Sequence, residues 1–173
     1  MLNIYINTWG NYNENGADLG EWITLPMNED TLQEKLDQVA ERMCDDDPEW
    51  FVNDYEWTTE INLFEVNEMD DYFDLNSRLN DFSDLNEWEQ KEIAAAIEAF
   101  GYNFEEAYEK QQDGRFTFYP DWDLEEVAEE LVNDCYFTKD TPEIFTRYFD
   151  YEAFARDLGF DGYYETKYGV IVE

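Results

Sequence analysis

The sequence contains no histidine, only two cysteines and only ten basic residues among its 173 positions. Without histidine, the chain cannot build a Ser-His-Asp or Cys-His catalytic arrangement or a histidine-ligated metal site. Cys44 and Cys135 are too few for a thiolate zinc site, and two distant cysteines are typical of free thiols rather than of a disulfide framework. We therefore expect no catalytic residues, no metal and no cofactor.

Phosphate-binding motifs and membrane segments are missing as well. Neither GxxxxGK[ST] nor GxGxxG occurs, and the ten scattered bases form no cluster that would hold a phosphorylated substrate or a nucleic acid. No segment approaches the roughly 18 apolar residues of a membrane span, and the first residues do not form a basic and apolar leader. The sequence predicts a cytoplasmic protein that binds neither nucleic acid nor membranes.

What the chain has in excess is negative charge, with 45 acidic residues against ten bases and a net charge of −35. Disordered acidic chains are poor in aromatic residues, whereas this chain has 6 Trp, 13 Tyr and 13 Phe, which is enough to build a core. Residues 1–57 carry 14 acids and 2 bases, 58–101 carry 12 and 2, and 102–173 carry 19 and 6. The charge therefore covers the whole fold, and strongly basic proteins are the expected partners.

Periodicity and turn residues predict a mixed α+β chain of three small subdomains. The first, residues 1–57, is a sheet-plus-helix unit with strands over Leu2–Thr8, over Glu21–Leu25 and from Trp50, a loop over Gly10–Gly16, and a helix from Thr31 to Met43 capped by Asp30. The second, residues 58–101, is helical, most clearly over Asn86–Phe100. The third, residues 102–173, combines helices over Phe104–Gln111, Asp123–Cys135 and Pro142–Leu158 with a strand over Arg115–Tyr119 and a hairpin of Gly162–Lys167 and Gly169–Val172.

The segment Asp123–Cys135 shows how the charge is organised. Its apolar residues recur at helical spacing, and its glutamates fall on the opposite face; the apolar set is Leu124, Val127, Ala128, Leu131, Val132 and Cys135. Carboxylates four residues apart are about 6 Å apart along a helix axis, close to the roughly 6.8 Å that two nucleotides of one DNA strand advance. We therefore predict phosphate-mimicking, target-binding carboxylates at Glu34, Asp37, Glu41, Asp70, Asp71, Asp74, Glu105, Glu109, Glu125, Glu126, Glu129 and Glu130.

Any one of these carboxylates is more simply explained as a solvated surface group, so the hypothesis concerns the whole set. A net charge of magnitude about 2–8 suffices for the solubility of a small domain. Duplex DNA carries one charge per ~1.7 Å, so 35 charges correspond to about 60 Å of duplex. A compact chain of this length has a radius of gyration near ~16 Å, so mimicry by the full charge predicts an elongated molecule.

One short run allows a catalytic interpretation. Asp121, Asp123 and Glu125 are spaced like the DxDxE run of one glycosidase class, but enzymes of that class are large barrels. An N-cap at Asp123 followed by acidic residues in the first helical turn explains the same pattern more simply.

Three stretches resemble the ArdA antirestriction proteins of mobile genetic elements. They are IYINTWGNYNENGADLGEWITLP at Ile4–Pro26, LEEVAEELVNDCYF at Leu124–Phe137 and PEIFTRYFDYEAFARDLGFDGYY at Pro142–Tyr164. They occur in the same order over the whole chain, whereas residues 58–101 are similar only in character and Met43–Trp50 has no clear counterpart.

The resemblance implies an elongated α+β homodimer whose carboxylates imitate the phosphates of bent B-form DNA. Such a protein occupies the DNA-binding groove of type I restriction-modification enzymes and protects incoming plasmid or transposon DNA. In the last matched stretch we expect core residues at Tyr148, Phe149, Tyr151, Phe154 and Leu158. The candidates for the dimer interface are Tyr136, Phe137, Ile144 and Phe145.

Three alternatives remain open at this stage. The first alternative is a mimic directed at another DNA-binding protein, such as a CRISPR effector, a nucleoid protein or a repressor. The second is a salt-adapted protein whose acids only retain hydration. The third is a hydrolase that uses a carboxylate pair, because 45 carboxylates guarantee some neighbours.

Overall fold

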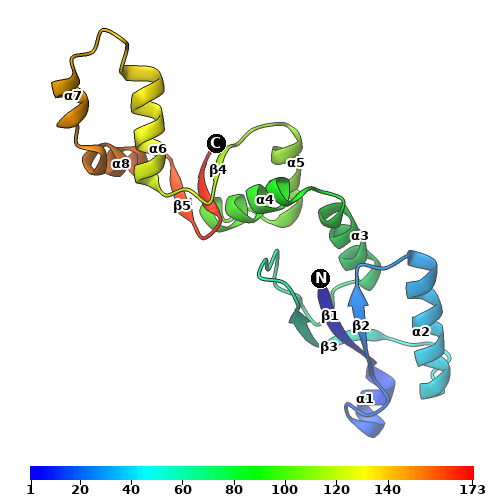
Figure 1. The fold of residues 1–173 in the computed structure, drawn as a ribbon. Coiled ribbons are helices and arrows are strands. Elements are labelled where there is room, and N and C mark those ends of the chain that lie inside the picture. Colours follow the sequence, from blue (N-terminus) through cyan, green and yellow to red (C-terminus); the bar gives the residue numbers. More distant parts are fainter. The chain divides into compact units, whose positions relative to one another are not determined.

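The computed structural model describes residues 1–173, which divide into two compact units, 1–86 (unit 1) and 87–173 (unit 2). Eight α-helices, one π-helical turn and two three-stranded antiparallel sheets make up these units (Figure 1). The predicted α+β class is confirmed, while the division into three subdomains stays a prediction. None of the helices combines the length and the apolar character that a membrane crossing requires.

The sheet of unit 1 has the strand order β2-β1-β3, formed by Glu21–Leu25, Leu2–Thr8 and Trp50–Trp57. The alternation in β1 sends Leu2, Ile4 and Ile6 into the core, where all three are fully buried. The predicted bounds of β1 and β2 are confirmed: alternation indicated β1, and Pro26 indicated where β2 ends.

Helix α2 (Glu29–Met43) lies on the buried face of this sheet. It buries Leu32, Leu36 and Val39, and its basic residues Lys35 and Arg42 form ion pairs with Glu21 of β2, at 3.9 and 2.9 Å. The N-cap is Asn28, whose side chain accepts hydrogen bonds from the amides of residues 30 and 31. The expected cap at Asp30 is wrong because the helix begins two residues earlier than the apolar pattern indicates.

Helix α1 (Trp9–Asn15) occupies the segment for which a loop was expected. Thr8 caps it by accepting a hydrogen bond from the amide of Asn11 at 3.1 Å. Side-chain amides four residues apart then bond to one another, Asn11 Nδ2 to Asn7 Oδ1 at 2.8 Å and Asn15 Nδ2 to Asn11 Oδ1 at 3.0 Å. These amide bonds and the contacts of Trp9 and Tyr12 with the ring of Phe51 stabilise the helix, so the loop prediction over Gly10–Gly16 is wrong.

Helix α3 (Tyr72–Ser83) completes unit 1 and ties its loops to the sheet. The Tyr72 hydroxyl donates to the carbonyl of Phe51 in β3 at 2.6 Å. Asn76 is fully buried, and its side chain both accepts from the amide and donates to the carbonyl of Met27, each at 2.8 Å. The segment between β2 and α2 is therefore fixed by one side chain of α3.

Unit 2 is built around α4 (Glu87–Phe100), which contacts α5 (Phe104–Gln112) and all three strands of the second sheet. That sheet has the order β4-β6-β5, formed by Thr117–Pro120, Gly169–Val172 and Tyr164–Thr166. Gly169 has a φ of 133°, and a Cβ there would lie 2.2 Å from the carbonyl oxygen of Tyr119. The turn into β6 therefore requires glycine.

Two helical predictions in unit 2 need correction. The helix expected over Asp123–Cys135 is α6 (Leu124–Leu131) followed by a π-helical turn, η1 (Val132–Tyr136), and this wider turn leaves Cys135 exposed rather than in the core. The single helix expected over Pro142–Leu158 is two helices, α7 (Glu143–Arg147) and α8 (Tyr151–Phe160). Asp150 starts α8 as its N-cap by accepting from the amide of residue 153 at 2.9 Å, which explains the break.

Replacing Asn76 by Ala is expected to lower the free energy of unfolding by about 2 kcal/mol, because the partly buried amide and carbonyl of Met27 lose their partner. Urea denaturation of N76A and of the control S77A, an exposed position on the same helix, measures the effect. An unchanged urea midpoint for N76A would show that the hydrogen bonds between Asn76 and Met27 do not stabilise the fold.

Candidate functional site

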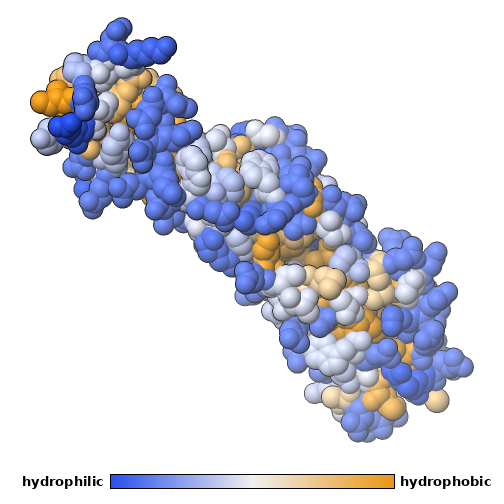
Figure 2. Space-filling view, in the orientation of Figure 1, coloured by the Kyte–Doolittle hydropathy of each residue, from blue (hydrophilic) through white to orange (hydrophobic).

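Almost all of the carboxylates face solvent. Forty of the 45 acidic residues are exposed, four are half-buried, and Glu92 alone is buried. We call the forty exposed carboxylates the acidic surface. Figure 2 shows hydrophilic side chains over most of the visible face of both units.

The few basic residues are used inside each unit. Within unit 1 and unit 2 taken separately, ion pairs join seven of the ten bases to only six carboxylates. The paired bases are Lys35, Arg42, Arg78, Lys91, Lys110, Arg115 and Arg147. Most of the acidic surface is therefore left without a compensating cation from its own unit.

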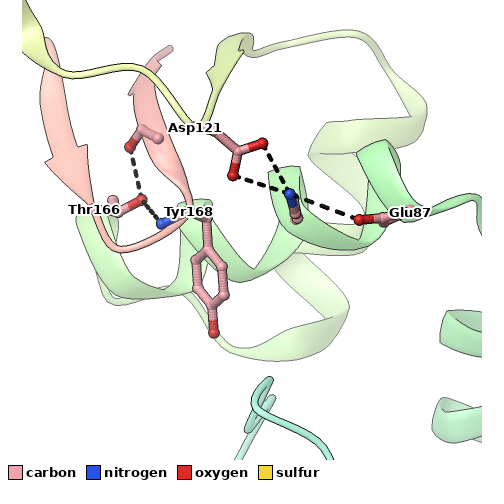
Figure 3. A network of polar contacts seen from close by, with 6 residues as sticks. Glu87, Asp121, Thr166 and Tyr168 are labelled. Atoms are coloured by element: carbon pink, nitrogen blue, oxygen red, sulfur yellow. Dashed lines mark hydrogen bonds and ion pairs between the residues drawn. The ribbon is translucent and has the colours of Figure 1, made fainter.

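Lys91 of α4 is the best-connected of these bases (Figure 3). Its Nζ lies 3.0 Å from both carboxylate oxygens of Asp121 and 3.7 Å from Glu87. The hydrogen bond to Asp121 is the main cause that raises the pKa of Lys91; desolvation lowers that pKa in part, and the charges of Asp121 and Glu87 raise it further. Asp121 itself has a φ of 62°, and its amide donates to the carbonyl of Tyr168 at 2.9 Å.

These contacts give structural roles to the run that allowed a catalytic interpretation. Asp121 joins β4 to α4 through Lys91. Asp123 caps α6 in a capping box. Its side chain accepts a hydrogen bond from the backbone amide of Glu126, and the Glu126 side chain accepts one from the backbone amide of Asp123. The N-cap predicted for Asp123 is confirmed.

The twelve predicted target-binding carboxylates fall into four groups, each on or beside one helix. They lie on α2 (Glu34, Asp37, Glu41), at the start of α3 (Asp70, Asp71, Asp74), on α5 (Glu105, Glu109) and on α6 (Glu125, Glu126, Glu129, Glu130). Eleven of the twelve are exposed, and Asp70 is half-buried.

Several members of this set also have local partners that the sequence did not reveal, and Asp37 is one of them because it accepts a hydrogen bond from Gln33 Nε2 at 2.8 Å. Asp70 accepts from the amide of residue 67, Asp71 caps α3, Asp74 pairs with Arg78, and Glu126 belongs to the capping box. On α6, Glu125, Glu129 and Glu130 face solvent, while Val127 and Ala128 on the opposite face are fully buried against α8 and β6. Helix α6 therefore presents the predicted row of carboxylates.

The four predicted dimer-interface residues come together around one pocket. Tyr136, Phe137, Ile144 and Phe145 line a cavity of about 700 Å³, together with Thr141, Tyr148, Phe149 and Asp150. Helix α7 buries none of its own residues, and Ile144 and Phe145 are each 62% exposed. Tyr148, which was expected in the core, is 77% exposed because it lies in the break between α7 and α8. Unit 2 thus has an open apolar surface in an otherwise acidic chain.

Glu92 of α4 is the exception among the carboxylates, with 3% of its surface exposed. Burial raises its pKa to about 7, a hydrogen bond with Gln111 of α5 lowers it in part, and the charge of Glu89 raises it further. Sequence reasoning missed this group, although it directly precedes the buried run Ile93–Ala96. That run, apolar at four consecutive positions, indicates a helix covered on more than one face.

Comparison with protein families gives one match over nearly the whole chain. The family described as antirestriction protein (ArdA) matches residues 4–172. The comparison with curated proteins found no match. The resemblance noted in the sequence is therefore confirmed at the level of the family.

Glu92 is expected to make stability depend on pH. The pKa of Glu92 is about 7 in the folded chain and 4.5 ordinarily. The contribution of the protonated side chain to the free energy of unfolding is therefore complete below pH 4.5 and is lost as the pH rises to about 7. The loss is on the order of 3 kcal/mol. E92Q is expected to unfold at higher urea concentration than the wild type at pH 8, and to show less change between pH 4.5 and 7.

The exposed α5 variant E109Q is the control for E92Q and should follow the wild type. Equal pH profiles for the wild type and E92Q would contradict a raised pKa at Glu92.

Proposed function

Because the chain belongs to the ArdA family of antirestriction proteins, we propose that it blocks type I restriction-modification enzymes as a mimic of B-form DNA. The acidic surface enters the basic groove that normally holds the duplex. Restriction and modification both require bound DNA, so a protein in the groove blocks both. In this proposed role the chain acts by occupying the groove and catalyses no reaction.

The observation that carries this proposal is the separation of charges. Forty carboxylates face solvent, while seven of the ten bases are held in ion pairs within their own unit. Such a surface attracts a cationic groove over long range and accelerates association. Solubility alone needs far less charge.

Spacing adds to the charge. Glu125 and Glu129 on α6 are separated by one helical turn, about 6 Å along the axis, and both are exposed. The spacing of these two carboxylates is therefore similar to the spacing of phosphates that a DNA-binding groove contacts along one strand. The acidic surface would suit the groove of a CRISPR effector, a nucleoid protein or a repressor as well, and membership of an antirestriction family favours the restriction enzyme. Such targets lie in the cytoplasm, where the protein is expected to act on behalf of a mobile element.

The apolar pocket of unit 2 supports a homodimer. Its lining combines aromatic and aliphatic side chains, and its most exposed members are Tyr136, Ile144, Phe145 and Tyr148. Monomeric soluble proteins rarely expose contiguous apolar surface of this kind, and the cores of homodimer interfaces are apolar. A second copy of the chain would cover the pocket and double the number of exposed carboxylates.

Neutralising several carboxylates is expected to weaken binding, whereas neutralising one should have little effect. A single exposed charge contributes about 0–1 kcal/mol, so E129Q should change affinity for a type I enzyme by less than about fivefold. The triple variant E125Q/E129Q/E130Q should lose roughly tenfold or more in low salt and show a weaker salt dependence. Direct binding of the labelled protein to the enzyme at several salt concentrations measures both.

The charge-preserving variant E125D/E129D/E130D is the control and should compete like the wild type. Full restriction and modification activity in the presence of excess wild-type protein would refute the proposed function.

Substituting the pocket residues is expected to dissociate the dimer. The variant I144S/F145S removes apolar side chains that are already exposed in the single chain, so its fold should persist while its mass falls from twice 20.8 kDa to 20.8 kDa. Light scattering on a sizing column measures this. F160S, which alters an apolar side chain 81% exposed outside the pocket, should remain dimeric. A wild-type chain that is monomeric at micromolar concentration would contradict the dimer.

A further inference from the structure

The sheet of unit 1 has one face that its helix α2 does not cover. Glu21 reaches α2, and in the strand register it lies opposite Ile6, so the face bearing Ile6 is the covered one. The neighbouring positions therefore point to the other side. The outer face, as we call it, consists of Asn3, Tyr5, Trp22, Thr24, Asp54 and Glu56.

A fixed aromatic pair stands in the middle of the outer face. Tyr5 of β1 and Trp22 of β2 are cross-strand partners with ring centroids 5.3 Å apart. The Tyr5 hydroxyl donates to the carbonyl of Ala17 at 2.7 Å, and its ring lies so close to Gly20 that a Cβ there would be 2.6 Å from it. Tyr5 is thereby held in place, while Trp22 remains 48% exposed.

Carboxylates flank this pair on the neighbouring strand. Asp54 is the register partner of Tyr5 in β3, and Glu56 is the partner of Asn3. Both carboxylates are exposed, and Asp54 is oriented by the amide of Tyr55, which donates to it at 2.8 Å. Strands lie about 4.8 Å apart, so Trp22 and Asp54 are separated by roughly 10 Å with Tyr5 between them.

The bases of unit 1 are engaged at other positions. Lys35 and Arg42 pair with Glu21, and Arg78 pairs with Asp74. The outer face therefore combines an exposed indole with negative charge and has no ion pair to a base of its own unit. A planar cation that is weakly hydrated matches this combination, because it stacks on an aromatic face and is drawn by nearby carboxylates.

We propose that the outer face receives an arginine side chain of the basic groove, with the guanidinium stacked on Trp22 and Asp54 and Glu56 supplying the attraction. This inference rests on the proposed function for the identity of the partner, and on the outer face alone for the preference for arginine. Lysine, a compact and strongly hydrated cation, fits less well over an indole. The stacking on Trp22 adds a component of binding that ionic strength affects little, beside the salt-dependent attraction of the carboxylates.

Oligo-arginine and oligo-lysine peptides of nine residues test this preference without the enzyme, since both carry the same charge. Calorimetric titration of the wild type should show tighter binding of the arginine peptide. W22T, which keeps a residue suited to a strand, should lower the ratio of the two affinities by roughly threefold or more. W22F should restore part of the ratio, and T24V, at the next outer-face position of β2, should leave it unchanged.

If Trp22 has only a structural role, a different result is expected for W22T. In that case W22T would lower the thermal midpoint and weaken both peptides equally, which would overturn the proposal. An unchanged ratio in a stable W22T would overturn it as well.

Inhibition of a type I enzyme gives the second readout. W22T should weaken competition with DNA by a similar factor at low and at moderate salt, whereas E125Q/E129Q/E130Q should alter the salt dependence itself. If the wild type inhibits and W22T inhibits equally at every salt concentration, the arginine contact is absent and the proposed function stands. If the wild type does not inhibit at all, the proposed function fails, and the peptide ratio alone decides whether the outer face prefers arginine.

Discussion

Mutual repulsion among 45 carboxylates is the constraint to which every element of this structure conforms. Unit 1 carries 22 acids and 3 bases, and unit 2 carries 23 acids and 7 bases, so each unit must hold a large net charge around a small core. Helices such as α6 reserve one face for apolar contact and turn the other to water. Aromatic contacts such as Trp9 on Phe51, stacked with centroids 4.2 Å apart, supply burial that offsets the repulsion.

The parts of the fold that follow from apolar periodicity were predictable from the sequence. The strand β1 follows from the alternation of its apolar residues, and Pro26 marks the end of β2. Helix α1 was missed because its seven residues are rich in asparagine and glycine, and amide bonds four residues apart and the contacts of Trp9 and Tyr12 with Phe51 stabilise it. The break between α7 and α8 was missed because aromatic residues continue through it, and only the cap at Asp150 marks the new helix.

The acidic surface was predictable because a carboxylate is costly to bury, so exposure is the default. Glu92 departs from that default through packing of α4 against α5, a long-range contact that no local pattern encodes. Ile144 and Phe145 were named from the sequence as dimer-interface candidates together with Tyr136 and Phe137, and the structure places all four around one pocket. The pairing of Tyr5 with Trp22 depends on strand register, which fixes which side chains share the outer face.

Forty exposed carboxylates also gather a cloud of small cations from solution, as the phosphates of a duplex do. When either polyanion enters a basic groove, part of its cloud returns to the solvent, and added salt opposes that release. When the acidic protein replaces DNA in the groove, the protein releases cations while the DNA takes cations up again, so much of the effect of salt cancels. Under the proposed function, competition between this chain and DNA is therefore less sensitive to ionic strength than the binding of either partner alone, and it operates under the same ionic conditions in which the duplex itself binds.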